Sequence, residues 1–302
     1  MEQQFLEELQ HIAGTNRIHR LEPMSRHTTF RVGGPADVLV KPDYKTLPDI
    51  IRLCRKYGET YYVVGNGSNL LVGDKGIRGV VIEMVTEGQK LTITGDRVIA
   101  GDGMLLSRVA NFAADHELTG MEFASGIPGS IGGAVVMNAG AYGGEMKDII
   151  ESVRVLDAAG CEKVLELKEL ELGYRKSCIL KNNYVVMEVA LKLSQGDPGA
   201  IRDRMRELNE QRRTKQPLEY PSAGSTFKRP EGYFAGKLIM DAGLRGYRLG
   251  GAQVSEKHCG FVINRDSATA EDIYQLIGHV SAEVERQFGV KLEPEVKMVG
   301  ER

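Results

Sequence analysis

Two glycine-dense stretches contain the first residues whose types and spacing could do chemistry. They are Gly65-Asn66-Gly67-Ser68-Asn69-Leu70 and Gly126-Ile127-Pro128-Gly129-Ser130-Ile131-Gly132-Gly133. Glycines allow positive φ angles and a close approach of the backbone to a ligand, so successive N–H groups can converge on an anion. Both stretches therefore favour a phosphate-containing ligand. For either stretch alone, glycines that simply turn strands in a β-rich domain stay an alternative.

Two common nucleotide-binding loops do not fit these residues. A Rossmann turn needs a third glycine and then a helix, whereas Leu70 occupies that position and an apolar, strand-like run follows it. A phosphate-binding loop of the kinase and ATPase type needs Ser or Thr after Gly-Lys, whereas Leu238 follows Gly236-Lys237. Neither a Rossmann dehydrogenase nor a nucleotide hydrolase is supported.

The two stretches are part of an ordered series of motifs through which the chain resembles the UDP-N-acetylenolpyruvoylglucosamine reductase family. The other motifs lie at residues 27–34, 137–143, 173–177, 223–230, 250–258 and 292–297. The resemblance covers nearly the whole chain and matches the shorter of the family's two structural types. It implies an α+β flavoprotein, with a two-subdomain FAD-binding domain of the vanillyl-alcohol-oxidase or PCMH-like type and a C-terminal α+β substrate-binding domain.

The resemblance also implies a reaction. The family reduces the enolpyruvyl ether of UDP-N-acetylglucosamine to UDP-N-acetylmuramate in peptidoglycan precursor synthesis, with non-covalent FAD and with NADPH as the hydride donor. Hydride from flavin N5 reaches the terminal methylene carbon, negative charge moves toward the carboxylate, and the neighbouring carbon takes a proton. The protein must stabilise that charge and supply that proton.

Four residues match the family's catalytic positions. Arg175 offers paired donors to a carboxylate, and Ser225 matches the proton donor. Lys215 matches a cation that would stabilise the serine alkoxide, and Glu295 matches a group that hydrogen-bonds the polarised enolpyruvyl group. The residues alone leave other interpretations open: Arg175 as a surface ion-pair residue, Ser225 as a turn residue and Glu295 as an acid on a strand surface.

The binding residues follow from the same resemblance. The flavin contacts are Gly65, Asn66, Gly67, Ser68, Asn69, Leu70, Gly126, Ile127, Pro128, Gly129, Ser130, Gly132, Gly133 and Lys297. Lys297 stands where many members have arginine. The substrate contacts are Tyr142, Tyr174, Arg229, Lys237 and His258. No cluster of His, Cys, Asp and Glu has metal-ligand spacing, so we expect no metal.

The elements that must position these residues are predicted from hydrophobic periodicity. Helices are expected near residues 5–12, 47–57, 105–112, 198–208, 235–242 and 270–284, and strands near 61–64, 70–72, 80–82, 91–100, 153–155, 185–193, 261–263 and 296–298. We expect Gly58 to end the second helix, Gly95-Asp96 to turn a hairpin and Thr269 to cap the last helix. A change of character at Gln195-Gly196-Asp197-Pro198 marks a domain boundary. We expect an N-terminal helical segment at 1–26, an FAD-binding domain at 27–195, with subdomains of about 27–83 and 84–195, and a substrate-binding domain at 196–302.

The composition of the chain argues against some classes of binding partner and indicates the compartment. The net charge of −2, from 39 basic and 41 acidic residues, provides no global field for nucleic acid or an anionic membrane. The basic cluster Arg202, Arg204, Arg206, Arg212 and Arg213 is interrupted by acids and predicts a solvated helix face. The four cysteines are widely spaced, and neither a leader nor an apolar run of about 20 residues is visible. We expect a cytoplasmic monomer.

Two other functions stay open. One is an oxidase or dehydrogenase of the same flavin fold that acts on an alcohol or hydroxy acid. The set Lys215, Ser225, Lys237 and Glu295 argues against it, because an unrelated oxidase has no reason to share these residues. The other is a nucleotide-binding module without turnover, which would be purified colourless and would not take up FAD.

Overall fold

The computed structural model describes residues 1–85 and 88–302, which form two compact units. Unit 1 comprises Met1–Arg20, Val38–Asn66 and Gly79–Arg212, and unit 2 comprises Leu21–Asp37, Gly67–Arg78 and Arg213–Arg302. The last division falls between Arg212 and Arg213, inside helix α6 (Pro198–Lys215), whereas the sequence places a domain boundary just before this helix. The three expected domain ranges stay a prediction.

Helices and short strands are interspersed along the chain, with β3 to β7 following one another between α2 and α3. The helices are α1 (Gln3–Ala13), α2 (Leu47–Tyr57), α3 (Leu106–Asp115), α4 (Ile131–Met137), α5 (Cys178–Lys181), α6, α7 (Ala235–Asp241) and α8 (Ala270–Phe288). The strands are β1 (Ile18–Pro23), β2 (Pro35–Val40), β3 (Tyr61–Val64), β4 (Leu70–Val72), β5 (Ile77–Glu83), β6 (Leu91–Thr94), β7 (Arg97–Gly101), β8 (Leu118–Thr119), β9 (Gly140–Ala141), β10 (Gly144–Glu145), β11 (Ile150–Leu156), β12 (Glu162–Glu166), β13 (Val185–Lys192), β14 (Ser194–Gln195), β15 (Arg248–Leu249), β16 (Ala252–Val254), β17 (Val262–Asn264) and β18 (Lys297–Val299). The 3-10 helices are η1 (Thr15–Arg17), η2 (Met24–Arg26), η3 (Glu122–Ala124), η4 (Met146–Asp148) and η5 (Leu167–Leu170). Within residues 1–85 and 88–302, no helix is long and apolar enough to cross a membrane.

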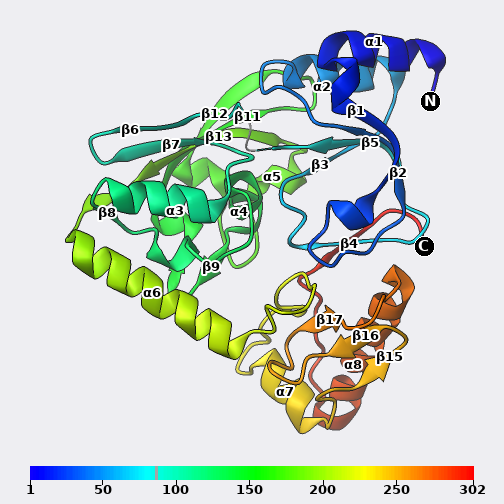
Figure 1. Cartoon of the computed structure of the whole chain (residues 1–302), viewed down its shortest axis with the longest axis vertical. Helices are drawn as coiled ribbons and strands as arrows, with labels where there is room; N and C mark the ends of the chain where they lie inside the picture. Colours follow the sequence, from blue (N-terminus) through cyan, green and yellow to red (C-terminus); the bar gives the residue numbers. More distant parts are fainter. Residues whose placement is uncertain (86–87) are drawn as a thin grey trace. The chain divides into compact units, whose positions relative to one another are not determined.

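The first layer of unit 1 joins α1 and α2 to a small sheet. Helix α2 begins with Leu47-Pro48 and ends at Gly58, which takes the left-handed conformation that the sequence predicts for a helix stop. Its buried face packs in one core with α1 and with strand β5, which pairs in parallel with β3. Figure 1 shows α1 and α2 side by side on this part of unit 1.

The second layer of unit 1 is an antiparallel sheet in the order β12-β11-β13-β7-β6. The predicted hairpin around Gly95-Asp96 is confirmed, with Gly95 at φ +62° between β6 and β7. Alternating residues of β13 and β7 enter a core that also contains the buried side of α3. Figure 1 shows α3 and α4 on the same side of this sheet.

Helix α4 replaces part of a predicted loop. The sequence predicts one glycine-rich loop over residues 126–133, but the helix begins at Ile131, with Ser130 as its N-cap and the Ser130 Oγ accepting from the Gly133 N–H. A Cβ at Gly132 would lie 2.8 Å from the Cβ of Asp102. Gly132 therefore serves close packing of the helix on the segment after β7.

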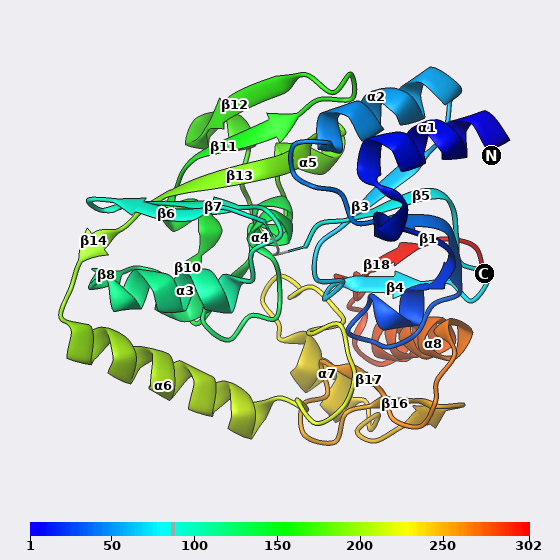
Figure 2. The same cartoon turned by 45° about the horizontal axis from the view of Figure 1, so that its top comes forward.

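Unit 2 contains the small sheet β15-β16-β17, helices α7 and α8, and the parallel pair β4 and β18. Its core is centred on the buried face of α8, where Ile273, Leu276, Ile277, Val280 and Val284 recur at the predicted spacing. Figure 2 shows β18 beside β4.

The first turn of α8 is capped by two segments that are far apart in sequence. The hydroxyl of Thr269 accepts from the Asp272 N–H at 3.0 Å, as the sequence predicts for this cap. The carboxylate of Asp74 accepts from the N–H groups of Ala270 and Glu271 at 2.8 and 3.0 Å. Since the first N–H groups of a helix have no partner inside it, Asp74 joins the segment after β4 to α8.

We predict that Asp74→Ala lowers the free energy of unfolding by about 1 kcal/mol, because two N–H groups lose a charged acceptor at the positive end of a helix dipole. Urea titration followed by circular dichroism measures the change. The matched control is Asp203→Ala, which removes an exposed carboxylate that pairs with Arg206 on α6 and should change little. Equal losses in both variants would contradict the capping role.

A buried acid lies beneath the first turn of α4. Asp102 is 4% exposed, its carbonyl accepts from the Gly132 N–H at 2.9 Å, and its carboxyl accepts from the Gln89 side-chain amide at 3.1 Å. Burial raises the pKa of Asp102 to about 7, although the bond from Gln89 acts in the opposite direction. The folded protein therefore keeps a proton on Asp102 at pH values where the unfolded chain has lost it.

We predict that Asp102→Asn removes a pH dependence of stability. The contribution is fully present below pH 4, where Asp102 is protonated in both states, and is lost as the pH rises to about 7, because only the folded state then holds the proton. Relative to the wild type, the variant should gain up to about 4 kcal/mol between pH 4 and pH 7. Denaturant titrations across this range measure the difference.

Asp96→Asn is the matched control for this experiment. Asp96 is exposed and pairs with Lys192, and this bond holds the pKa of Asp96 below its usual value. Since the usual pKa of an aspartate is about 4, Asp96 carries its charge in both the folded and the unfolded state from pH 5 to pH 7, and over this range the control curve should run parallel to that of the wild type. A parallel curve for Asp102→Asn as well would show that the buried acid does not titrate as described.

Candidate functional site

The two glycine-rich stretches meet inside unit 1. The Asn66 side-chain amide donates to the Pro128 carbonyl at 2.6 Å, and a Cβ at Gly65 would lie 2.2 Å from the Ser130 Oγ. Glycine at position 65 is therefore required by the approach of the second stretch. Of the predicted flavin contacts, the structure brings together Gly65, Asn66, Gly126, Ile127, Pro128, Gly129, Ser130, Gly132 and Gly133 in this unit.

The backbone of the second stretch is suited to an anion. In the part of the chain that the structure describes, the N–H groups of Gly129 and Ser130 donate to no protein acceptor, although Ser130 is only 3% exposed. A buried N–H without a partner costs free energy, so an acceptor on a ligand would be stabilising here. The small side chains leave room for a backbone approach, and these features fit the diphosphate of a dinucleotide such as FAD.

Arg175 lies in a tight turn in the same unit. Gly173 and Lys176 exchange two backbone hydrogen bonds, and Arg175 between them has φ +53°, a strained value for a residue with a side chain. The guanidinium is half-buried, lies over the Tyr174 ring at 5.1 Å and donates to the Gly140 carbonyl at 3.4 Å. Tyr174 is 55% exposed.

Asn138 bonds to the turn of Arg175 and is not among the site residues that the sequence predicts. It is completely buried, and its amide donates to the Gly173 carbonyl at 3.1 Å and to Glu145 at 2.7 Å. Its side-chain Oδ1 accepts from the Lys147 N–H at 2.9 Å. Asn138 thus holds the turn of Arg175 against the β9-β10 hairpin. Its place in the motif at 137–143 is the one signal in the sequence that points to it.

Tyr142 lies at the tip of the β9-β10 hairpin. Tyr142 and Gly143 both have positive φ, as a two-residue hairpin turn requires. The Arg212 guanidinium lies 5.9 Å from the centre of the Tyr142 ring, and its Nε would lie 3.0 Å from a Cβ at Gly126. Burial lowers the pKa of Arg212, and the Tyr142 hydroxyl opposes this effect.

The prediction that the basic residues of α6 form a solvated face is therefore wrong for Arg212. Arg204 and Arg206 do pair with acids one turn away on the exposed side of the helix. Arg212, near the C-terminal end of the helix, packs instead between Tyr142 and the glycine-rich stretch, where a cation faces the residues predicted to bind ligand. The sequence pattern did not distinguish it, because alternating charges dominate the helix.

The remaining glycine-motif residues belong to unit 2. Gly67 has φ +59°, and its carbonyl accepts from the Thr29 N–H at 3.2 Å, so the motif at residues 27–34 supports this loop. The Asn69 carbonyl accepts from the Lys297 N–H at 2.9 Å, and its amide donates to the Glu295 carbonyl at 3.3 Å. The parallel pair of β4 and β18 places Leu70 opposite Lys297. Predicted cofactor residues and the predicted catalytic glutamate are neighbours here.

Ser225 and Glu295 are also brought together within unit 2. The Glu295 N–H donates to the Thr226 carbonyl at 2.8 Å, and the pairing continues where the Lys228 N–H donates to the Glu293 carbonyl at 2.9 Å. Ser225 is exposed and Glu295 is half-buried. Lys215 is an exposed residue at the C-terminal end of α6, ten residues before Ser225 in the sequence.

The three predicted substrate contacts of unit 2 have different surroundings. The Arg229 guanidinium stacks 4.0 Å from the centre of the Phe234 ring. Lys237 pairs with Asp241 at 2.7 Å on the exposed side of α7. The Nδ1 of His258 accepts from the Gly260 N–H at 3.1 Å, and burial lowers the pKa of His258. This bond leaves the ring proton of neutral His258 on Nε2.

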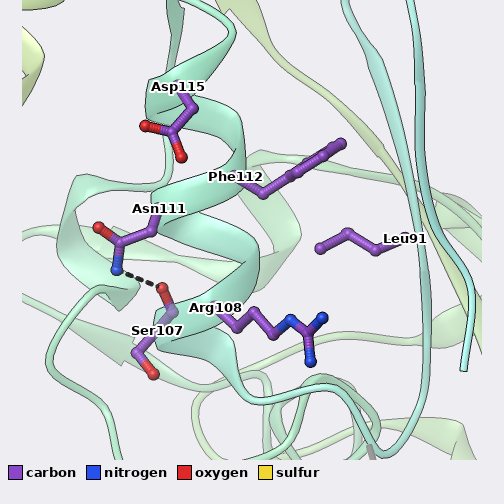
Figure 3. A pocket seen from close by; sticks show the side chains of 6 residues that line it. All are labelled: Leu91, Ser107, Arg108, Asn111, Phe112 and Asp115. Carbon is purple, nitrogen blue, oxygen red and sulfur yellow. Dashed lines mark hydrogen bonds between the residues drawn. The ribbon is translucent and has the colours of Figure 1, made fainter. Parts of the chain in front are cut away.

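A hollow on unit 1 involves none of the predicted site residues. Its lining residues are Leu91, Ser107, Arg108, Asn111, Phe112 and Asp115. Figure 3 shows Arg108 and Phe112 on the side of α3 where Leu91 lies, and Ser107, Asn111 and Asp115 on the other side of the helix. Arg202 of α6 donates to Asn111 at 2.9 Å and pairs with Asp115. Across residues 1–85 and 88–302, no group of three or more His, Cys, Asp or Glu could hold a metal.

Comparisons with known proteins identify the family to which this chain is similar. Residues 36–166 match the family model "FAD binding domain", and residues 216–299 match "UDP-N-acetylenolpyruvoylglucosamine reductase, C-terminal domain". The chain is 54% identical to a UDP-N-acetylenolpyruvoylglucosamine reductase of Lachnoclostridium phytofermentans over 98% of this chain and 97% of that protein.

Solved structures agree with this result. The crystal structure of UDP-N-acetylenolpyruvylglucosamine reductase from Thermus caldophilus is 37% identical, with a TM-score of 0.81 over 93% of this chain and 98% of that one. Phl p 4.0202, a glucose dehydrogenase, has a TM-score of 0.51 at 12% identity over 65% of this chain and 45% of that one, and shows the fold alone. The predicted fold class, a PCMH-like FAD-binding domain with a C-terminal α+β domain, is confirmed. The chain belongs to the UDP-N-acetylenolpyruvoylglucosamine reductase family of FAD-dependent oxidoreductases.

Proposed function

We propose that this chain reduces the enolpyruvyl ether of UDP-N-acetylglucosamine to UDP-N-acetylmuramate, with NADPH as the hydride donor and Ser225 as the proton donor. The observation that carries the proposal is the Glu295 to Thr226 hydrogen bond of 2.8 Å, which places two proposed catalytic residues on paired segments. The family relationship supports the choice of substrate. FAD, when bound, supplies the hydride that it has received from NADPH.

The protein's own contribution begins with charge. As hydride reaches the methylene carbon of the substrate, negative charge moves toward the carboxylate, and Arg175 stabilises it with the planar, paired donors of a guanidinium. The turn from Gly173 to Lys176 and the buried amide of Asn138 hold Arg175 in place before the substrate arrives. Preorganised donors lower a barrier because they need no reorientation during the reaction.

Protonation is the second contribution. The carbon next to the carboxylate is strongly basic once the hydride has arrived, so a serine hydroxyl suffices as the acid. Ser225 gives its proton to this carbon and becomes an alkoxide, which Lys215 stabilises and solvent reprotonates. Glu295 hydrogen-bonds the polarised enolpyruvyl group.

The substrate contacts are proposed in the same way. Arg229 and Lys237 are cations that suit a diphosphate, and the pair of Lys237 with Asp241 must open or rotate for Lys237 to bind it. His258 can donate from Nε2 as a neutral ring. Tyr142 and Tyr174 are partly exposed aromatic side chains in the same unit as Arg175.

The proposed roles of NADPH and Ser225 are tested together by separating the two half-reactions. We predict that Ser225→Ala leaves NADPH-driven loss of the visible flavin absorbance unchanged in an anaerobic stopped-flow experiment. Reoxidation of the photoreduced variant by the enolpyruvyl substrate should slow by about 10² to 10⁴-fold, the usual contribution of a positioned acid.

Three outcomes would contradict parts of the proposal. Unchanged reoxidation in Ser225→Ala would remove Ser225 from the mechanism. A wild-type flavin that NADPH does not reduce would remove the proposed donor. A reduced wild-type enzyme that reacts rapidly with oxygen and ignores the enolpyruvyl substrate would favour an oxidase instead.

We predict that Arg175→Lys slows reoxidation by the enolpyruvyl substrate by about 10 to 100-fold, because lysine keeps the charge but loses the paired donors. The neighbouring variant Lys176→Gln removes an exposed charge from the same turn and should react as the wild type does. The same anaerobic mixing experiment measures both. Comparable rates for Arg175→Lys and the wild type would show that paired donation is not needed.

A further inference from the structure

Thr226 is a completely buried polar residue directly after the exposed Ser225. Two segments of unit 2, one at residues 260–262 and one at Glu295, form three hydrogen bonds with it. Its N–H donates to the Gly260 carbonyl at 2.8 Å, its carbonyl accepts from the Glu295 N–H at 2.8 Å, and its Oγ1 accepts from the Val262 N–H at 2.8 Å. All three bonds are short and are shielded from water.

Gly260 extends this junction to His258. The Gly260 N–H donates to the His258 Nδ1 at 3.1 Å. A Cβ at Gly260 would lie 2.9 Å from the His258 Cε1 and 3.6 Å from the Ser225 Oγ. The hydroxyl of Ser225 and the ring of His258 therefore border the same small space, and the residue that separates them is bonded directly to Thr226.

We propose that Thr226 is a positioning residue for the protonation step, holding the Ser225 hydroxyl in register with Glu295 and His258 through its bonds to Glu295, Gly260 and Val262. The inference rests on the proposed roles of Ser225 and Glu295. The side chain contributes the bond to Val262, the first residue of β17, which ties the Ser225 segment to the sheet. Thr226 touches neither substrate nor cofactor in this role.

The hydroxyl is required because Val262 is itself buried, at 1% exposed. A valine at position 226 has nearly the same shape but no acceptor, so the Val262 N–H would lose its partner in an apolar environment. The segments can relieve this only by moving relative to each other. Displacements of about 1 Å at reacting groups reduce rates by about 10²-fold.

The test compares Thr226→Val with Thr226→Ser in the flavin-loaded enzyme. Thr226→Val should slow reoxidation by the enolpyruvyl substrate by about 10 to 100-fold, while NADPH-driven flavin reduction stays within about twofold of the wild type. Thr226→Ser keeps the hydroxyl acceptor, and its rate of reoxidation should stay within about threefold of the wild-type rate. In the Ser225→Ala background, Thr226→Val should add almost nothing, because both changes act on one step.

Val284→Ala is the control for general destabilisation. Val284 is completely buried in α8, in the core of the same unit, and its truncation lowers stability without touching the junction. This variant should melt at a lower temperature and keep both half-reaction rates. Thermal melts and flavin content of all variants are recorded beside the kinetics.

The outcomes separate the inference from the proposed function. Slow reoxidation in Ser225→Ala together with normal reoxidation in folded Thr226→Val would overturn the role of Thr226 alone. Normal reoxidation in Ser225→Ala would overturn the proposed function first. If Thr226→Val and Val284→Ala slow both half-reactions equally, or if Thr226→Ser does not restore the rate, the role of Thr226 is structural and the inference is wrong.

Discussion

The pairing of residues 226–228 with residues 293–295 is the interaction on which the proposed chemistry of unit 2 depends. Ser225 and Glu295 are far apart in sequence, and backbone hydrogen bonds from Glu295 to Thr226 and from Lys228 to Glu293 hold their segments in register. Backbone bonds in a buried environment fix segments more firmly than contacts between exposed side chains. The same region receives Asn69 and Lys297, so residues predicted to contact cofactor are bonded to the segment of the proposed catalytic glutamate.

In unit 1, closely packed segments must leave some backbone N–H donors available to an anion. Gly65 makes room for Ser130, Gly126 makes room for Asn209 and Arg212, and Gly132 makes room for Asp102. These three glycines are therefore required for close packing, whereas the N–H groups of Gly129 and Ser130 stay available to a ligand. At pH values below its raised pKa, the carboxyl group of Asp102 is neutral and adds no negative charge next to Gly132.

A buried polar residue lies next to two of the proposed catalytic groups. Asn138 stands behind Arg175 and Thr226 stands behind Ser225, and both are completely buried polar side chains whose bonds reach segments distant in sequence. Burying a polar group costs free energy unless the group is hydrogen-bonded. The backbone around Asn138 and around Thr226 is therefore stable only in the arrangement that provides these hydrogen bonds. Arg175 also accepts a left-handed backbone conformation, which the tight turn around it maintains.

The sequence alone determined the main helices and strands, because periodicity, Gly58 as a stop and the Thr269 cap are local signals. It also determined the family, because its motifs are ordered along nearly the whole chain. The tertiary structure decided that Ser130 caps a helix, that Arg212 faces the glycine-rich stretch, and that Asn138 and Thr226 are buried and bonded next to residues of the proposed site. These features depend on contacts between segments distant in the chain, and such contacts leave no periodic trace in the residues themselves.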